Sequence, residues 1–211
     1  MRRWGGVWLP IAAAAVIIGV VLVVAGIVFG PDRGGPPDVP TGGGGGASGE
    51  PAAAAPMSRS APVRIRIPAI GVDAPVLPLG LNTDGTVQEP SLNRPELTSW
   101  YNGGAAPGER GPAAFYGHVD TRASGPAVFY DLGRLRPGAK VKVLREDGRT
   151  AVFQITSIEQ VPKSQFPTER VYGRTAEPTI RLMTCGGEFD PVKRSYKDNI
   201  IAYGVLINAS G

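Results

Sequence analysis

Two residues of this 211-residue chain are each the only one of their type, Cys185 and His118. Cys185 follows a strand-like run, 178–184, and precedes a pair of glycines that would let backbone or substrate approach closely. His118 follows a second strand-like run, 113–116. A free thiol is most often a small buried apolar group, but a nucleophilic thiol needs an acid or base beside it. Because His118 is the only imidazole available, we interpret the two residues as a catalytic pair.

Attack on a carbonyl group also requires a group that stabilises the negative charge developing on the carbonyl oxygen. Arginine suits this role because its guanidinium stays protonated and offers several N–H donors. Arg194, which precedes the last strand-like run, is the expected arginine. Arg181 is the alternative, since strand alternation places it on the same face as Met183 and Cys185.

The composition excludes several classes of site. One Cys and one His rule out an intrachain disulfide and any zinc site that needs two histidines. The formal net charge is +4, and the basic residues alternate with apolar ones or lie in turn-like segments. The sequence contains no basic stripe with interleaved aromatic residues, so we expect no nucleic-acid partner.

The elements that must position these residues are short strands. Residues 62–211 form the expected globular domain, in which turns rich in Gly and Pro separate strand-like runs. About eight such runs predict an all-β barrel or sandwich, with short helices only near 95–98 and 128–135. The strand-like runs are 63–67, 74–79, 99–102, 113–116, 140–145, 150–161, 178–184 and 199–207.

The first 61 residues predict a membrane anchor and a tether. Residues 7–29 carry no charge over 23 positions, which is long enough for one transmembrane helix, and we assign 1–29 to this anchor. Arg2 and Arg3 favour a cytoplasmic N-terminus, with the rest of the chain outside the cell membrane. A cleaved signal peptide is the alternative. Gly, Pro, Ala and Ser occupy 24 of the 32 positions in 30–61, which is typical of a disordered tether.

Taken in order along the chain, these features resemble the sortases, which are extracytoplasmic cysteine transpeptidases of Gram-positive cell envelopes. The resemblance rests on the Gly-His-Val-Asp run at 117–120, the Thr-Cys pair that follows, a downstream arginine and the N-terminal anchor. It covers essentially residues 62–211. The Thr-Cys-Gly-Gly-x-Phe-Asp run at 184–190 and the Tyr-x-Asp-Asn run at 196–199 resemble most the actinobacterial class F subgroup.

The resemblance implies an eight-stranded β-barrel and a role for each matched residue. Cys185 would be the nucleophile, His118 the family histidine and Arg194 the arginine. The positions implied for substrate binding are Thr184, Gly186 and Asp120.

The resemblance also implies an activity. A sortase-like enzyme would cleave an LPXTG-like sorting signal of a secreted protein between Thr and Gly and form a thioacyl enzyme. An amine acceptor, such as a peptidoglycan amino group, or water would then release the product. We expect no metal, no cofactor and a monomeric chain.

Three other readings compete with this one. Papain-like enzymes place Cys before His, the reverse of the order here, and an L,D-transpeptidase would show a Ser-His-Gly-Cys run that is missing. The third alternative is a membrane-tethered β-barrel binding module whose cysteine is inert.

Overall fold

The computed structural model describes residues 35–40 and 51–211. The anchor predicted for 1–29, and residues 30–34 and 41–50 of the predicted tether, lie outside these residues. In the part of the chain that the structure describes, none of the helices has the length and apolar character needed to cross a membrane.

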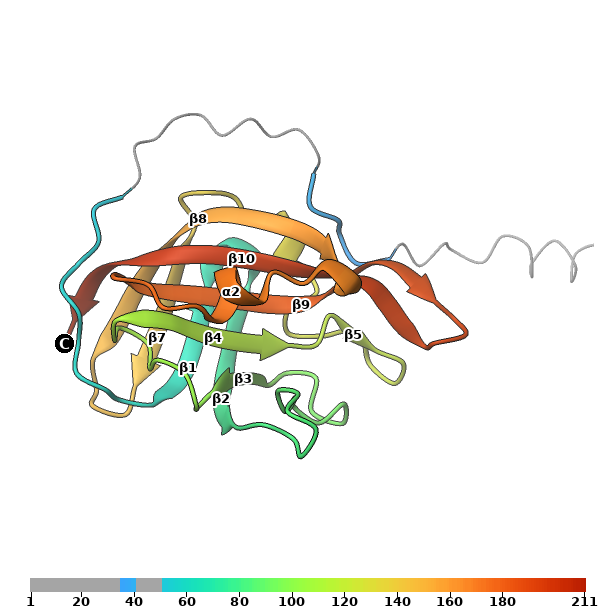
Figure 1. Ribbon diagram of the computed structural model, residues 1–211, viewed down its shortest axis with the longest axis horizontal. Coiled ribbons are helices and arrows are strands. Elements are labelled where there is room, and N and C mark those ends of the chain that lie inside the picture. Colours follow the sequence, from blue (N-terminus) through green and yellow to red (C-terminus); the bar gives the residue numbers. More distant parts are fainter. Residues whose placement is uncertain (1–34, 41–50) are drawn as a thin grey trace, which may run out of the picture. The chain divides into compact units, whose positions relative to one another are not determined.

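Eight strands close into a barrel, which confirms the all-β prediction (Figure 1). The β2–β3 and β4–β9 pairs are parallel, and the other neighbouring strands are antiparallel. In order around the barrel the strands are β1 (Pro62–Ile67), β2 (Val72–Leu79), β3 (Thr98–Tyr101), β4 (Gly111–Gly117), β9 (Pro178–Asp190), β10 (Ser195–Ser210), β8 (Thr150–Pro162) and β7 (Lys140–Arg145).

Alternation along the strands fills the barrel interior with apolar side chains. On β7, Val141 and Val143 are buried whereas the residues between them are exposed, as a strand with one buried face requires. On β9, Ile180 and Leu182 belong to the interior cluster, and Met183 points to the opposite face. The outward-facing Met183 therefore lies on the same side of β9 as Cys185, two residues further on.

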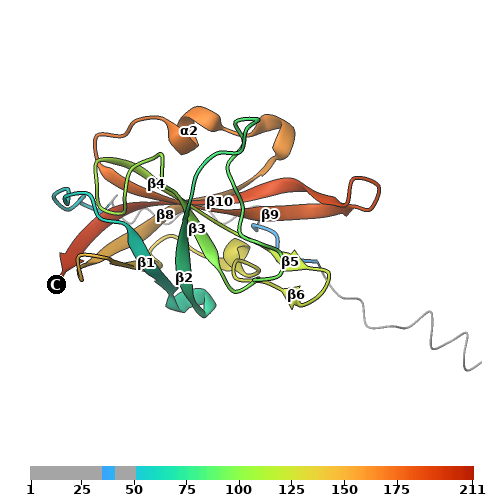
Figure 2. The same cartoon turned by 90° about the horizontal axis from the view of Figure 1, so that it is seen from below.

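A short helix, α2 (Thr168–Tyr172), covers part of this outer face. Its Val171 is fully buried in a cluster with residues of β4, β9 and β10. Figure 2 shows α2 outside the ring of strands, on the side of β4. No pattern in the sequence predicted this helix.

The remaining elements are short. A two-stranded ribbon, β5 (Asp120–Thr121) with β6 (Gly125–Pro126), follows β4. The helix predicted near 95–98 is wrong, because these residues form a turn that ends where β3 pairs with β2 at Thr98. The segment 128–135 contains turns and a single 3-10 turn, η2 (Leu132–Arg134). Two further 3-10 turns are η1 (Pro68–Ile70) and η3 (Lys163–Gln165).

Residues 51–61 lie along the barrel, so the prediction of a disordered tether is wrong for this stretch. The Ala54 amide donates to the Leu206 carbonyl at 2.8 Å, and the Met57 amide donates to the Gly108 carbonyl at 2.8 Å. The Met57 side chain is buried in the main core cluster. The composition predicted a solvated linker because one large apolar residue, Met57, among Ala, Pro and Ser forms no periodic pattern.

Candidate active site

Cys185 lies within β9 rather than at its end, because β9 continues to Asp190 and remains paired with β10. The residue directly opposite Cys185 on β10 is Asn199. The thiol is half-buried and, as the sequence requires, free. The expectation that the strand ends at Thr184 is wrong because Gly186 stays paired with Asp198 and Gly187 begins a bulge inside the strand instead of a turn.

The bulge sets the register of Cys185. Gly187 and Glu188 together oppose the single residue Lys197, which is the two-against-one pattern of a β-bulge. Gly187 has a φ of 73°, a left-handed conformation that favours glycine. Bulges of this kind commonly re-aim side chains beside active sites.

Gly186, whose predicted role in substrate binding stays a prediction, is buried against β10. A Cβ atom added to Gly186 would lie 2.7 Å from the Ile200 side chain. Gly186 is also not among the residues that line the cavity beside Cys185. Close packing of the two strands accounts for this glycine.

His118 follows β4 directly and lies at the same end of the sheet as Cys185. Strands β4 and β9 are parallel, and their last register pair is Tyr116 with Met183, so two more steps along each chain lead to His118 and Cys185. The buried Thr184 hydroxyl donates to the Gly117 carbonyl at 2.8 Å and links the two segments. His118 and Cys185 line one cavity of about 530 Å³. The structure thus brings the predicted pair together.

The hydrogen bond of the His118 ring defines which nitrogen carries a proton. Nε2 lies 2.6 Å from the Pro90 carbonyl oxygen. A carbonyl oxygen only accepts, so Nε2 must be the donor in this contact. Nδ1 is therefore the nitrogen that can gain or lose a proton without breaking the bond to the loop that carries Pro90.

The cavity is lined by both apolar and polar residues. Tyr116, Phe166, Tyr172 and Met183 supply apolar surface, and the hydroxyls of Tyr116 and Tyr172 bond to each other at 2.5 Å. The β2–β3 loop closes another side through residues 85–87, 89 and 90. Thr184 and Asn199 add polar groups next to the thiol.

The electrostatic environment favours the neutral thiol. Burial raises the pKa of the Cys185 thiol above its ordinary value, and the charges of Glu89 and Asp120 raise it further. The Lys163 ammonium lowers the pKa of the same thiol. Lys163 lies in η3, and its Nζ donates to the Ser195 hydroxyl at 2.8 Å.

Asp120 contacts a tyrosine of β10. The Tyr196 hydroxyl donates to the Asp120 carboxylate. Burial, together with this bond, raises the pKa of Tyr196. Asp120 is not one of the residues lining the cavity, although its charge acts on the thiol. Its predicted role in substrate binding stays a prediction.

The structure does not bring Arg194 to the cavity. Arg194 is exposed in the turn between β9 and β10, with a φ of 52°, at the hairpin end that extends beyond the neighbouring strands (Figures 1 and 2). It precedes Asn199 by five residues, which is about 16 Å of extended strand. Its assignment as the catalytic arginine stays a prediction.

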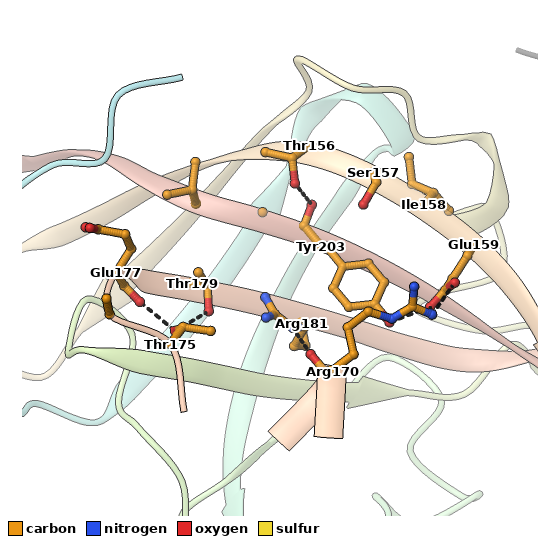
Figure 3. Close-up of a pocket in the computed structure, with 13 residues that line it drawn as sticks. Thr156, Ser157, Ile158, Glu159, Arg170, Thr175, Glu177, Thr179, Arg181 and Tyr203 are labelled. Atoms are coloured by element: carbon orange, nitrogen blue, oxygen red, sulfur yellow. Dashed lines mark hydrogen bonds and ion pairs between the residues drawn. The ribbon is translucent and has the colours of Figure 1, made fainter. Parts of the chain in front are cut away.

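The alternative, Arg181, lines a different cavity of about 490 Å³ (Figure 3). Its buried guanidinium donates to the carbonyls of Arg170 and Ile180, at 3.2 and 3.0 Å. It also lies over the Tyr203 ring, 4.9 Å from the ring centroid. These contacts hold the Arg181 guanidinium away from the cavity that contains Cys185.

Asn199 and Lys163 were not predicted from the sequence. Asn199 belongs to the Tyr-x-Asp-Asn run, but its position opposite Cys185 depends on the bulge. Without that extra residue in β9, the register would place Asn199 opposite Gly186. Lys163 follows a strand that is not adjacent to β9, so no spacing in the sequence connects it with the thiol. Among the described residues, no cluster of three or more His, Cys, Asp or Glu could hold a metal ion.

Comparison with known proteins gives a family and a fold. A family model described as the sortase domain matches residues 65–207. A search of curated proteins returns no significant match. The three solved structures compared below are 18–20% identical to this chain, so they support the fold alone.

Three of these structures illustrate the likeness. Sortase C2 of pilus island 1 from group B Streptococcus is 19% identical, with a TM-score of 0.52 over 69% of this chain and 73% of that chain. Sortase A from Listeria monocytogenes is 18% identical, with a TM-score of 0.52 over 71% and 90%. Sortase C-1 from Actinomyces oris is 20% identical, with a TM-score of 0.54 over 69% and 73%. Because the family model spans more than half of the chain, the protein belongs to the sortase family of cysteine transpeptidases.

Proposed function

We propose that this sortase cleaves an LPXTG-like sorting signal between Thr and Gly and transfers the product to an amine. The observation that carries the proposal is that the only histidine and the only cysteine of the chain line one cavity. The Tyr-x-Asp-Asn and Thr-Cys-Gly-Gly runs further support a class F enzyme.

The proposed reaction has two halves. In the first, the Cys185 sulfur attacks the Thr carbonyl carbon while its proton passes to His118 Nδ1. His118 then donates this proton to the nitrogen of the leaving Gly, and the C–N bond breaks to leave a thioacyl enzyme. In the second half, an acceptor amine, such as a peptidoglycan amino group, attacks the thioester and the thiol is restored. Water in place of the amine gives hydrolysis.

The cavity suits the residues of such a signal. The rings of Tyr116, Phe166 and Tyr172, with Met183, offer apolar surface for a leucine and a proline side chain. The thiol and His118 line the same cavity, together with Thr184. A peptide bound with its apolar residues against the rings would therefore present its following peptide bond to the nucleophile.

We also propose that residues 1–29 anchor the enzyme in the cell membrane with the barrel outside, on the basis of the 23 uncharged positions at 7–29. Membrane fractionation of cells expressing the full-length chain tests this. Recovery of the chain in the soluble fraction, or loss of its first residues, would contradict the anchor.

The activity is tested with the full-length chain and a panel of LPXTG-type peptides. We expect a mass increase at Cys185 equal to the acyl part of the peptide, and its transfer to added triglycine or another primary amine. Cys185→Ala should give no adduct, and His118→Gln should slow acylation by about 10²–10⁴-fold. The alternative, a binding module with an inert cysteine, predicts that the folded wild-type protein forms no adduct with any peptide. It also predicts that Cys185→Ala leaves the protein's cellular function intact.

A further inference from the structure

The cavity contains a hydrogen-bond donor that the catalytic pair leaves unused, the side-chain amide of Asn199. Attack on a carbonyl carbon moves an electron pair onto the oxygen, and enzymes stabilise this oxyanion with fixed donors, including asparagine amides. Arg194 lies in the hairpin turn and Arg181 lines another cavity. Neither arginine is among the residues that line the cavity around Cys185.

Asn199 is placed by the sheet itself. It is the register partner of Cys185, and directly opposed residues of antiparallel strands have Cβ atoms about 4.5–5.5 Å apart on the same face. On its other side Asn199 pairs with Val161 of β8, so its backbone lies between two strands. A donor on such a central strand is held more rigidly than one in a hairpin turn.

The Asn199 side chain is also available to a ligand. It is partly exposed and lines the cavity with Cys185 and His118. Among the residues that the structure describes, no hydrogen bond engages its side-chain amide, which offers two N–H donors. The neighbouring residue is different: the Asp198 carboxylate accepts a bond from Gln160 Nε2 at 2.9 Å, which ties β10 to β8.

We propose that Asn199 is the catalytic residue that stabilises the oxyanion, a role that rests on the transpeptidase function proposed above. As the Cys185 sulfur bonds to the carbonyl carbon, the π electron pair moves to oxygen and the Asn199 Nδ2–H donates to that oxygen. When the C–N bond breaks, the pair returns to form the thioester carbonyl, and the nitrogen leaves with the proton from His118. Asn199 itself loses and gains no proton.

The test compares two reactions of the same thiol in the full-length chain. Acylation by an LPXTG-type peptide or by p-nitrophenyl acetate forms an oxyanion, whereas alkylation by iodoacetamide does not. Asn199→Ala and Asn199→Leu remove the donor, and the second keeps a similar volume. We expect both variants to acylate about 10²–10³-fold more slowly, with alkylation within about threefold of the wild type. Asn199→Gln, which retains an amide, should recover part of the acylation rate.

Lys193→Ala is the matched control, since Lys193 is exposed in the same hairpin turn, and it should acylate at the wild-type rate. Thermal melts confirm that each variant is folded. The proposal is overturned if Asn199→Ala and Asn199→Leu are acylated at the wild-type rate. It is overturned equally if acylation is slow in Arg194→Ala and normal in the two Asn199 variants. A wild-type chain that is alkylated but never acylated would overturn the transpeptidase function, and this inference with it.

Discussion

At the scale of single residues, the Cys185 thiol is held mainly in its neutral form. Burial raises its pKa, the Glu89 carboxylate adds to the rise, and the Lys163 ammonium opposes it. Since the thiolate is the species that reacts with iodoacetamide, the alkylation rate reports this balance directly. We expect the rate to increase with pH around a midpoint above that of an ordinary cysteine.

The two charges should move this midpoint in opposite directions. Lys163→Met removes a cation that favours the thiolate, so the midpoint should rise and alkylation at a fixed neutral pH should slow. Glu89→Gln removes an anion that disfavours the thiolate, so the midpoint should fall. Alkylation measured by mass spectrometry from pH 6 to 10 tests both shifts, and Glu177→Gln in the second cavity is the control. Equal midpoints in all four proteins would refute this account of the thiol.

At the scale of elements, the bulge in β9 connects the stability of the barrel with the geometry of the site. Gly187 is left-handed, and a Cβ atom there would lie 2.3 Å from the Asp198 carboxylate. Gly187→Ala should therefore cost about 1–2 kcal/mol for the backbone alone, with displacement of Asp198 in addition. We expect a Tm lower by at least about 2–4 °C and a slower acylation of the folded protein, because the register of Asn199 opposite Cys185 depends on this bulge.

Gly148→Ala provides the comparison for the bulge. Gly148 has a φ of 78° in the β7–β8 turn, and an added Cβ would meet no atom within 4 Å. The Gly148→Ala variant should therefore lose only the stability that the left-handed backbone costs, and its acylation rate should stay unchanged. If the two variants acylate equally well, the bulge does not set the geometry of the site.

The same elements explain how much the sequence could predict. Alternation such as that of Val141 and Val143 depends only on neighbouring residues, so the strands and the barrel were predictable. The pairing of His118 with Cys185 was predictable because they are the only imidazole and the only thiol of the chain and each follows a strand-like run. The partner of Cys185 was not predictable, because one extra residue at Gly187 shifts the pairing across two strands. The α2 helix was missed because five residues hold too little apolar periodicity.

At the scale of the whole molecule, residues 51–61 act as part of the barrel domain. Arg145 is almost fully buried, and its guanidinium donates to the Ser58 carbonyl at 2.7 Å, the Pro107 carbonyl at 2.8 Å and the Asp147 carboxylate at 2.7 Å. Its Nη1 also lies 3.0 Å from the Met57 sulfur. A domain boundary at residue 62 would remove one acceptor of a buried cation and expose the core beneath Met57.

Two truncations separate the contribution of residues 51–61 to stability from that of residues 1–50. A chain that starts at Pro51 keeps every contact of Arg145, whereas one that starts at Pro62 loses Met57 and Ser58. Burial of a methionine side chain contributes about 1.5–3 kcal/mol, and a lost bond to a buried cation adds to the cost. We expect the shorter chain to be less stable by at least about 2 kcal/mol in urea unfolding, and its Tm to be lower by about 4–8 °C.

Met57→Ala in the full-length chain should reproduce much of this loss. Equal unfolding midpoints for the two truncations would show that the barrel is complete without residues 51–61.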